Sequence, residues 1–171
     1  PALKQKAAGE GKVFLDKMLA YLGACRPQGT RAYLADATDA QRQGYWRAPT
    51  VALHYLLTGD ADSLAKARGY LEEFVTSEHW ETGAEEDSGM AAANLAVGAG
   101  ILYDTLFADL EPAFREKARQ KLLLQARRLY YRGHLMKAGA SSSHYWQSDP
   151  HNNHRWHRDA GLAACVLAVA G

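Results

Sequence analysis

Two kinds of helical segment alternate along this chain, and the alternation constrains its fold more than any other feature. Segments 87–107 and 152–170 are rich in Ala and Gly and poor in charge, whereas 61–76 and 111–136 are amphipathic and charged. The sequence shows neither sustained alternation with a period of two nor clusters of β-branched residues, the usual marks of strands. We therefore expect an all-α fold, with small-residue helices inside and charged helices outside.

The segments and their breaks predict about six helices. Their expected ranges are 2–23, 39–57, 61–76, 87–107, 111–136 and 152–170. Gly59 and Asp60 stand where one helix should end and the next begin, and Pro112 falls in the first turn of another. We expect helices 39–57, 87–107 and 152–170 to pack as the inner layer.

A weak internal repeat links small-residue and charged helices. Segments 55–60 and 103–109 each end a small-residue helix and lead into a charged one, and 166–171 resembles a third copy. Such αα-hairpin repeats build either an open solenoid or a closed toroid. We expect residues 1–171 to be a single helical domain that forms part of an incomplete (α/α) toroid. Its open edge would expose apolar surface and promote self-association.

The charge balance gives no sign of a nucleic-acid or membrane partner. The chain has 20 basic and 19 acidic residues, so its net charge is +1. The longest apolar run, 160–171, is shorter than the roughly 20 residues that cross a bilayer. Basic residues gather on 111–136, which we interpret as a solvated outer face. The expected buried side of that helix consists of Leu122, Leu123, Leu124, Leu129 and Tyr130.

The cysteines and the amino terminus carry little functional information. Cys25 and Cys165 each lie among Ala, Leu or Gly, which predicts two buried free thiols rather than a disulfide. The chain starts at Pro1 with no initiator Met and no signal-peptide pattern. We therefore expect an upstream segment to have been removed or omitted.

Chemistry-bearing residues concentrate in segment 144–159. It holds four of the seven histidines and two of the four tryptophans, and such side chains are costly to bury without partners. Asn152, Asn153 and His154 should lie at the mouth of an inner helix, where amide and imidazole groups can meet an anion. The competing interpretation is that Asn152 or Asn153 simply caps the helix and His154 is a rim residue.

The same region is compatible with two other chemistries. His151, His154 and His157 have a spacing that invites a metal, but no Cys or HExxH pattern supplies further ligands, so no metal or cofactor is expected. Asp149 and an acid such as Asp87 could form the carboxylate pair of a glycoside hydrolase. The acidic cluster Glu81, Glu85, Glu86 and Asp87 also reads as an ordinary helix start.

We expect several aromatic residues to share one rim of the molecule with this segment. The set that falls near expected helix starts or in loops is Trp46, Trp80, Trp146, Trp156 and Tyr145. Side chains of this kind can stack on sugar rings, although some of them would be plain packing residues.

Two motifs resemble the heparinase II/III-like superfamily of polysaccharide lyases, which includes alginate lyases. One runs from Glu85-Glu86-Asp87-Ser88 through the Tyr103-Asp104-Thr105-Leu106 turn to Leu110-Glu111-Pro112. The other is Asn152-Asn153-His154-Arg155-Trp156 before Ala160-Gly161-Leu162. Together they cover roughly half of the chain. The resemblance implies an (α/α) toroid, usually followed by a β-sandwich that this chain lacks.

The resemblance also implies a reaction. Family lyases use an Asn or His at this helix mouth to neutralise a uronate carboxylate, and a tyrosine, with a histidine in some members, acts as base and acid in β-elimination. Asn153 and His154 match the neutralising position and are the expected catalytic residues. The family tyrosine would lie beyond Gly171, so the isolated chain should have little activity. Arg155 departs from the small residue that many relatives have there, which leaves the identity of the polymer open.

The expected function is thus cleavage of a uronate-containing acidic polysaccharide or oligosaccharide by β-elimination. The expected substrate-binding residues are Asn152, Arg155, Trp156, His157, Tyr145 and Trp146. The resemblance implies a periplasmic or secreted location. Two alternatives remain: a glycoside hydrolase on the same toroid, and a non-catalytic helical-repeat binding module.

Overall fold

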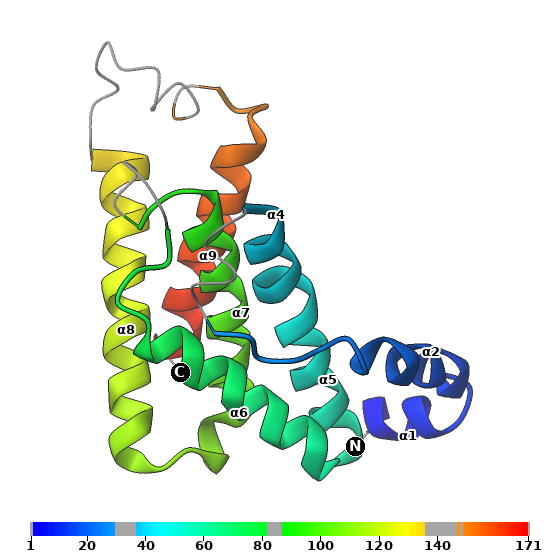
Figure 1. Ribbon diagram of the computed structural model, residues 1–171. Coiled ribbons are helices and arrows are strands. Elements are labelled where there is room, and N and C mark those ends of the chain that lie inside the picture. Colours follow the sequence, from blue (N-terminus) through cyan, green and yellow to red (C-terminus); the bar gives the residue numbers. More distant parts are fainter. Residues whose placement is uncertain (1, 30–36, 82–86, 136–146, 148, 171) are drawn as a thin grey trace.

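The computed structural model describes residues 2–29, 37–81, 87–135, 147 and 149–170, and every regular element in these ranges is helical (Figure 1). The all-α prediction is therefore confirmed. The elements are α1 (Ala2–Ala8), α2 (Lys12–Leu22), α4 (Ala37–Ala40), η1 (Gln41–Arg47), α5 (Ala48–Thr58), α6 (Ala61–Thr76), α7 (Met90–Leu106), η2 (Phe107–Asp109), α8 (Pro112–Tyr130), η3 (Tyr131–Leu135) and α9 (Asn153–Ala170).

The prediction of a single first helix over 2–23 is wrong, because a turn from Gly9 to Gly11 interrupts the helix. The amide of Gly11 donates to the Lys6 carbonyl at 2.8 Å, and a Cβ on Gly11 would lie 2.8 Å from the same oxygen. Two short helices result, and they project from the rest of the molecule (Figure 1). Large apolar side chains such as Phe14 stay exposed on them.

The expected helix 39–57 is continuous from α4 through α5 but contains a π-helical segment, η1, that the pattern did not predict. Gly44 of η1 packs directly on α7: a Cβ there would lie 2.5 Å from the Asn94 carbonyl oxygen and 2.8 Å from the Leu95 Cα. Only glycine allows this approach. The helix ends at Gly59 with φ of 75°, the left-handed cap that the sequence indicates.

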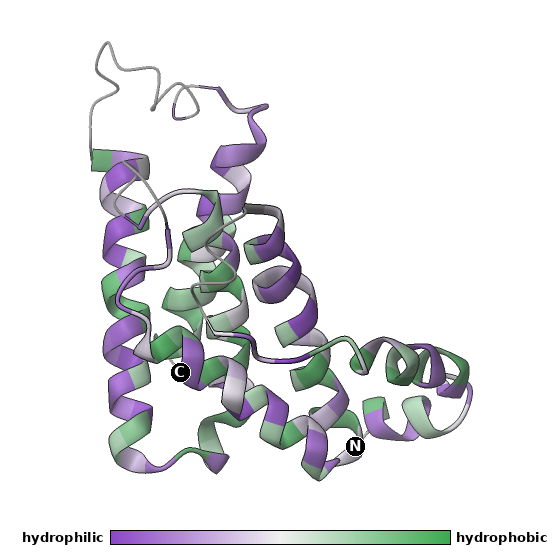
Figure 2. Ribbon diagram, viewed as in Figure 1, coloured by the Kyte–Doolittle hydropathy of each residue, from purple (hydrophilic) through white to green (hydrophobic). Residues whose placement is uncertain are grey.

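α7 is the centre of the fold. Twelve of its seventeen residues are buried, and it packs against η1, α5, α6, α8 and α9. Small residues bring α9 close: a Cβ on Gly161 would lie 2.6 Å from the Ala93 carbonyl oxygen, and one on Gly100 would lie 2.7 Å from that of Ala164. Figure 2 shows the resulting hydrophobic interior along α7 and α9.

The expected inner layer of three helices is found in full only for α7. α9 buries one face, which includes Gly161 and Cys165, and leaves Val166 and Leu167 exposed. α5 likewise leaves Leu53 and Leu56 exposed. A helix on which apolar residues occur all round needs neighbours on every side, and within the described residues only α7 has them.

The charged helices α6 and α8 are amphipathic, as expected, and each buries one face. The N-terminus of α6 is capped by Asp60, whose carboxylate accepts the Ser63 amide at 2.8 Å. On α8, Leu122 and Leu129 are buried as expected, but Leu124 and Tyr130 are exposed, which corrects the expected buried side.

Both cysteines are free and buried, as predicted. Burial raises the pKa of the Cys165 thiol to about 12. The segment Met90–Asp109 is apolar and long enough to cross a bilayer, which the search for uninterrupted apolar runs did not predict. However, 67% of its most apolar window is buried inside the molecule, as the core helix of a globular fold would be.

Candidate functional site

The chain enters α9 through a tight turn whose side chains satisfy the backbone. A carboxylate oxygen of Asp149 accepts the His151 amide at 2.9 Å, and the Asn152 side-chain oxygen accepts the His154 amide at 2.9 Å. Asn152 therefore caps the helix, as one of the two interpretations of this segment predicts, and its role in substrate binding stays a prediction. Asn153 is the first residue of α9 and is exposed.

His154 is held from one turn further along the same helix. The Arg158 guanidinium donates to the Nδ1 of His154 at 3.3 Å, while its Nε donates to the Ser88 carbonyl at 2.6 Å. Arg158 is only 2% exposed, so it ties α9 to the loop before α7 from inside the fold. A guanidinium can only donate, so the Nδ1 of His154 accepts and the proton of the neutral ring resides on Nε2.

His157 faces a different set of partners. Its Nδ1 lies 3.0 Å from the side-chain oxygen of Asn94 on α7, and its ring packs edge-on against Tyr45 with centroids 5.9 Å apart. Burial lowers the pKa of His157 below its ordinary value. His157 is therefore a neutral hydrogen-bonding group near pH 7, and it does not carry a charge that would attract a carboxylate.

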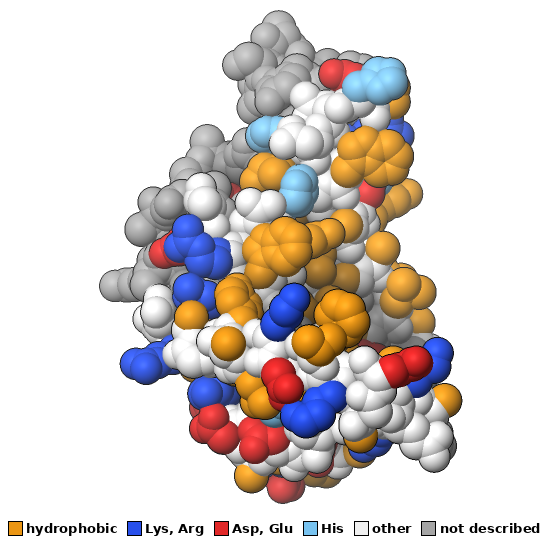
Figure 3. Space-filling model, turned by 90° about the vertical axis from the view of Figure 1, so that its right-hand side faces the viewer, with side chains coloured by type: hydrophobic (Ala, Val, Ile, Leu, Met, Phe, Trp, Pro, Cys, Tyr) orange, Lys and Arg blue, Asp and Glu red, His pale blue; other side chains and the backbone are white. Residues whose placement is uncertain are grey.

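The aromatic residues expected on one rim differ in exposure. Trp156 is 62% exposed, and its indole donates to the Pro150 carbonyl at 2.9 Å. Trp46 is 56% exposed, but Trp80 is completely buried and donates to the Phe74 carbonyl at 2.7 Å, so it is a packing residue. Figure 3 shows histidine side chains on the upper half of one face, with hydrophobic side chains among and below them. Tyr145 and Trp146 lie outside the described residues.

Arg155 is directed toward a carboxylate of its own helix. Its Nε lies 3.7 Å from Asp159, which also lies 3.3 Å from the Nε2 of His134 in η3. Both Arg155 and Asp159 are partly exposed, so a ligand carboxylate can compete for the guanidinium.

Two described residues of the acidic cluster, Asp87 and Glu81, make structural contacts. Asp87 is 3% exposed and has a φ of 58°. Its carboxylate accepts the amides of Trp80 and Glu81 and the guanidinium of Arg128 at 2.7 to 3.0 Å. The carboxylate of Glu81 accepts the Ala92 amide in the first turn of α7 at 3.2 Å. Both acids thus organise the start of α7, and Glu85 and Glu86 lie outside the described residues.

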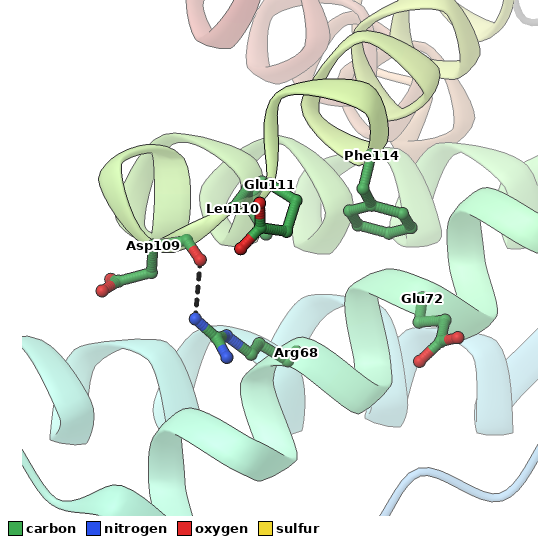
Figure 4. A pocket seen from close by; sticks show the side chains of 6 residues that line it. All are labelled: Arg68, Glu72, Asp109, Leu110, Glu111 and Phe114. Atoms are coloured by element: carbon green, nitrogen blue, oxygen red, sulfur yellow. Dashed lines mark hydrogen bonds between the residues drawn. The ribbon is translucent and has the colours of Figure 1, made fainter.

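A separate cavity of about 260 Å³ lies between α6 and the start of α8 (Figure 4). Its lining residues are Arg68, Glu72, Asp109, Leu110, Glu111 and Phe114. Arg68 closes one side by donating to the Asp109 carbonyl at 2.6 Å. Leu110 and Glu111 belong to the first of the two motifs, but none of the expected catalytic or substrate-binding residues lines this cavity.

The described residues bring Asn153, His154 and Trp156 to one helix end, and they join His157 to α7 and η1. In the described ranges no group of three His, Cys, Asp or Glu side chains lies close enough to hold a metal ion. Sequence reasoning missed Arg158, Asn94 and Tyr45. The spacing of four between His154 and Arg158 was a usable signal, whereas Asn94 lies 63 positions from His157, and no local pattern links the two.

Comparison of the sequence with protein-family models, with curated proteins and with solved structures gave no match.

Proposed function

We propose that this chain is the toroid part of a polysaccharide lyase that cleaves a uronate-containing polymer by β-elimination. The observation that carries the proposal is the arrangement at the start of α9, where exposed Asn153 stands beside a His154 that a buried arginine holds in place. The motif resemblance supplies the reaction class, and the geometry of this helix end is compatible with it.

The chemistry requires stabilisation of a second negative charge beside the first. Removing the C5 proton of a uronate places carbanion charge next to the carboxylate, so donors aimed at that carboxylate lower the barrier. The Asn153 amide and the Nε2–H of His154 are such donors, and the N-terminal end of α9 adds its own positive potential. One preorganised donor of this kind contributes roughly 3–4 kcal/mol.

Arg158 preorganises this site. Because its guanidinium is fixed by the Ser88 carbonyl, it keeps His154 in one tautomer and orientation before substrate arrives. Donors that need no reorganisation during the reaction are the effective ones. In this proposal a tyrosine accepts the C5 proton, as the motif resemblance implies.

The helix arrangement supports an arc of αα-hairpins. α9 exposes Val166 and Leu167, and a shallow cavity of about 240 Å³ lies between the second halves of α7 and α9. Its lining residues are Gly100, Ile101, Asp104, Ala164, Leu167 and Ala168. We propose that a further hairpin of a toroid, or a second copy of the chain, covers this surface.

The hydrolase alternative is less well supported. It needs Asp87 as an acid that faces substrate, but the Asp87 carboxylate is buried and bound by two amides and Arg128. Asp149 is engaged in the turn that precedes α9.

The test uses the full-length protein with alginate, hyaluronan and polygalacturonate. Elimination creates an unsaturated uronate with a new ultraviolet absorbance, whereas hydrolysis creates reducing ends without it. We expect the absorbance to rise with at least one polymer, and the rise to be lost in His154→Ala. Reducing ends that appear without the absorbance would contradict the proposal.

A further inference from the structure

A second group of side chains at the same end of the molecule takes no part in the proposed elimination. Tyr45 and Trp46 of η1 pack edge-to-face with ring centroids 5.4 Å apart, and Tyr45 in turn packs against His157 of α9. Two aromatic rings of η1 and an imidazole of α9 therefore form one cluster. His157 lies about one helical turn from Asn153 and His154 on α9.

Close backbone packing of η1 against α7 holds this cluster near α7. Gly44 contacts the backbone of Asn94, and the Asn94 side chain contacts His157, so one residue of α7 positions both halves of the cluster. The π-helical turn of η1 is the segment that presents Tyr45 next to His157. Such turns are rare and are often found at functional sites.

The hydrogen bond to Asn94 determines what His157 offers to a ligand. An amide oxygen only accepts, so the Nδ1 of His157 donates, and the Nε2 of the neutral ring presents a lone pair. Nε2 makes no hydrogen bond to a described residue, and the His157 residue is partly exposed. A lone pair accepts from a hydroxyl and repels a carboxylate.

Trp46 supplies the second feature of a sugar-binding site, an exposed aromatic face. More than half of its surface is exposed, and its indole nitrogen makes no hydrogen bond to a described residue. An aromatic face of negative potential attracts the positively polarised C–H groups of a sugar ring. An exposed indole and a hydrogen-bond acceptor, linked through the Tyr45 ring, suit the C–H face and a hydroxyl of a pyranose.

We propose that Trp46, Tyr45 and His157 form a subsite for a sugar ring that does not react, with the ring stacked on Trp46 and a free hydroxyl donating to the Nε2 of His157. This subsite deepens the proposed lyase function and rests on it. The ligand class is a uronate-containing oligosaccharide with unsubstituted hydroxyls. Asn94 is a positioning residue, because it acts through His157.

Binding is measured by calorimetry on the full-length protein in an Asn153→Ala/His154→Ala background, which prevents turnover. The probes are hexasaccharides of alginate, hyaluronan and polygalacturonate. For the probe that binds, Trp46→Ala should raise Kd by about tenfold, since stacking and apolar burial of this size are worth about 1.4 kcal/mol. Trp46→Phe should retain most of the affinity. Leu56→Ala is the matched control, because Leu56 is an exposed apolar residue (47%) on the same continuous helix.

A second measurement tests the hydrogen-bonding role of His157. The ¹⁵N chemical shifts of its ring should show the proton on Nδ1 in the free protein, and Asn94→Leu should remove that preference. Saturation of the subsite should shift the Nε2 signal. A ring that carries its proton on Nε2 would overturn the hydroxyl-acceptor role.

The two proposals fail in different ways. The subsite proposal is wrong if Trp46→Ala leaves the affinity for every probe unchanged relative to the Asn153→Ala/His154→Ala background. It is also wrong if no probe binds, even when the unsaturated product forms. If no unsaturated product forms but Trp46→Ala still loses affinity, the lyase reaction is wrong and a saccharide-binding site remains.

Discussion

The buried guanidinium of Arg158 lies 3.3 Å from the Nδ1 of His154, one turn away on the same helix, and also donates to the Ser88 carbonyl. One side chain thus orients the imidazole and joins α9 to the loop that leads into α7. Site geometry and fold stability are coupled through this residue.

Arg158→Lys should weaken both properties. A single ammonium cannot reproduce the two directed hydrogen bonds of the guanidinium, and a lost bond to a charged group costs about 1.5–3 kcal/mol. We expect a lower free energy of unfolding in urea, and a lower kcat at a temperature where circular dichroism shows the variant folded. Arg127→Lys, at an exposed position of α8, should change neither quantity. An unchanged kcat in folded Arg158→Lys would show that the arginine only stabilises the fold.

If the proposed elimination holds, Asn153→Ala and His154→Ala in the full-length protein should each lower kcat by about 10²–10³-fold with little change in KM, because both donors would act on charge that develops in the transition state. Asn152→Ala, at the adjacent position, is the comparison that separates stability from catalysis. Its side chain caps α9, so it should reduce stability by about 1 kcal/mol and leave the kcat of the folded enzyme near the wild-type value. Steady-state kinetics and urea unfolding of the three variants separate the roles. A near-normal kcat in both Asn153→Ala and His154→Ala would reduce the site to a helix cap and its rim.

How far the sequence could predict this molecule depends on whether a feature is local. Helix ends marked by Gly59, Asp60 and Pro112 were predictable, because caps and proline act within a few residues. The break between Gly9 and Gly11 was overlooked although its signal was present. The π-helical turn and the pairing of Asn94 with His157 arise from contacts between distant segments, which hydropathy patterns do not encode. The cap by Asn152 is local by contrast, and it is one of the two interpretations that the sequence offers for this residue.

Gly161→Ala should destabilise the fold, because the new Cβ would lie 2.6 Å from the Ala93 carbonyl oxygen. Backbone atoms of α7 cannot move aside without disturbing the core, and overpacking of this kind costs about 1–3 kcal/mol. Thermal unfolding should show a clear fall in Tm. Gly23→Ala is the control: the nearest atom to its Cβ would be 4.0 Å away and its φ is −60°, so its Tm should be unchanged or slightly higher. Equal Tm values for both variants would contradict the close approach of α7 and α9.

Stability should fall at mildly acidic pH in part because of His157. Burial lowers its pKa in the folded chain below the ordinary value of 6.5. As the pH falls through 6.5, the unfolded chain takes up a proton that the folded chain does not, so the free energy of unfolding decreases until the folded pKa is reached. His157→Gln lacks this contribution. Urea unfolding at about pH 7.5 and about pH 5 should therefore show a smaller acid-induced loss in His157→Gln than in the wild type. A loss of the same size in both proteins would show that the His157 ring is solvated in the folded chain and that burial does not lower its pKa.

Self-association of the 171-residue chain should depend on the exposed apolar part of α9. Leu167 is 74% exposed and lines the shallow cavity between α7 and α9, and apolar patches of this kind favour association. Leu167→Glu places a carboxylate in that patch, on a lining that already includes Asp104, so the two negative charges should oppose docking of a second copy. Sedimentation velocity over a range of concentrations should show oligomers of the wild-type chain and a monomeric Leu167→Glu variant. Leu53→Glu, at an exposed position of α5, should associate as the wild type does. If Leu53→Glu abolished association and Leu167→Glu did not, the interface would lie on α5, and the second half of α9 would not be the open edge of the helical array.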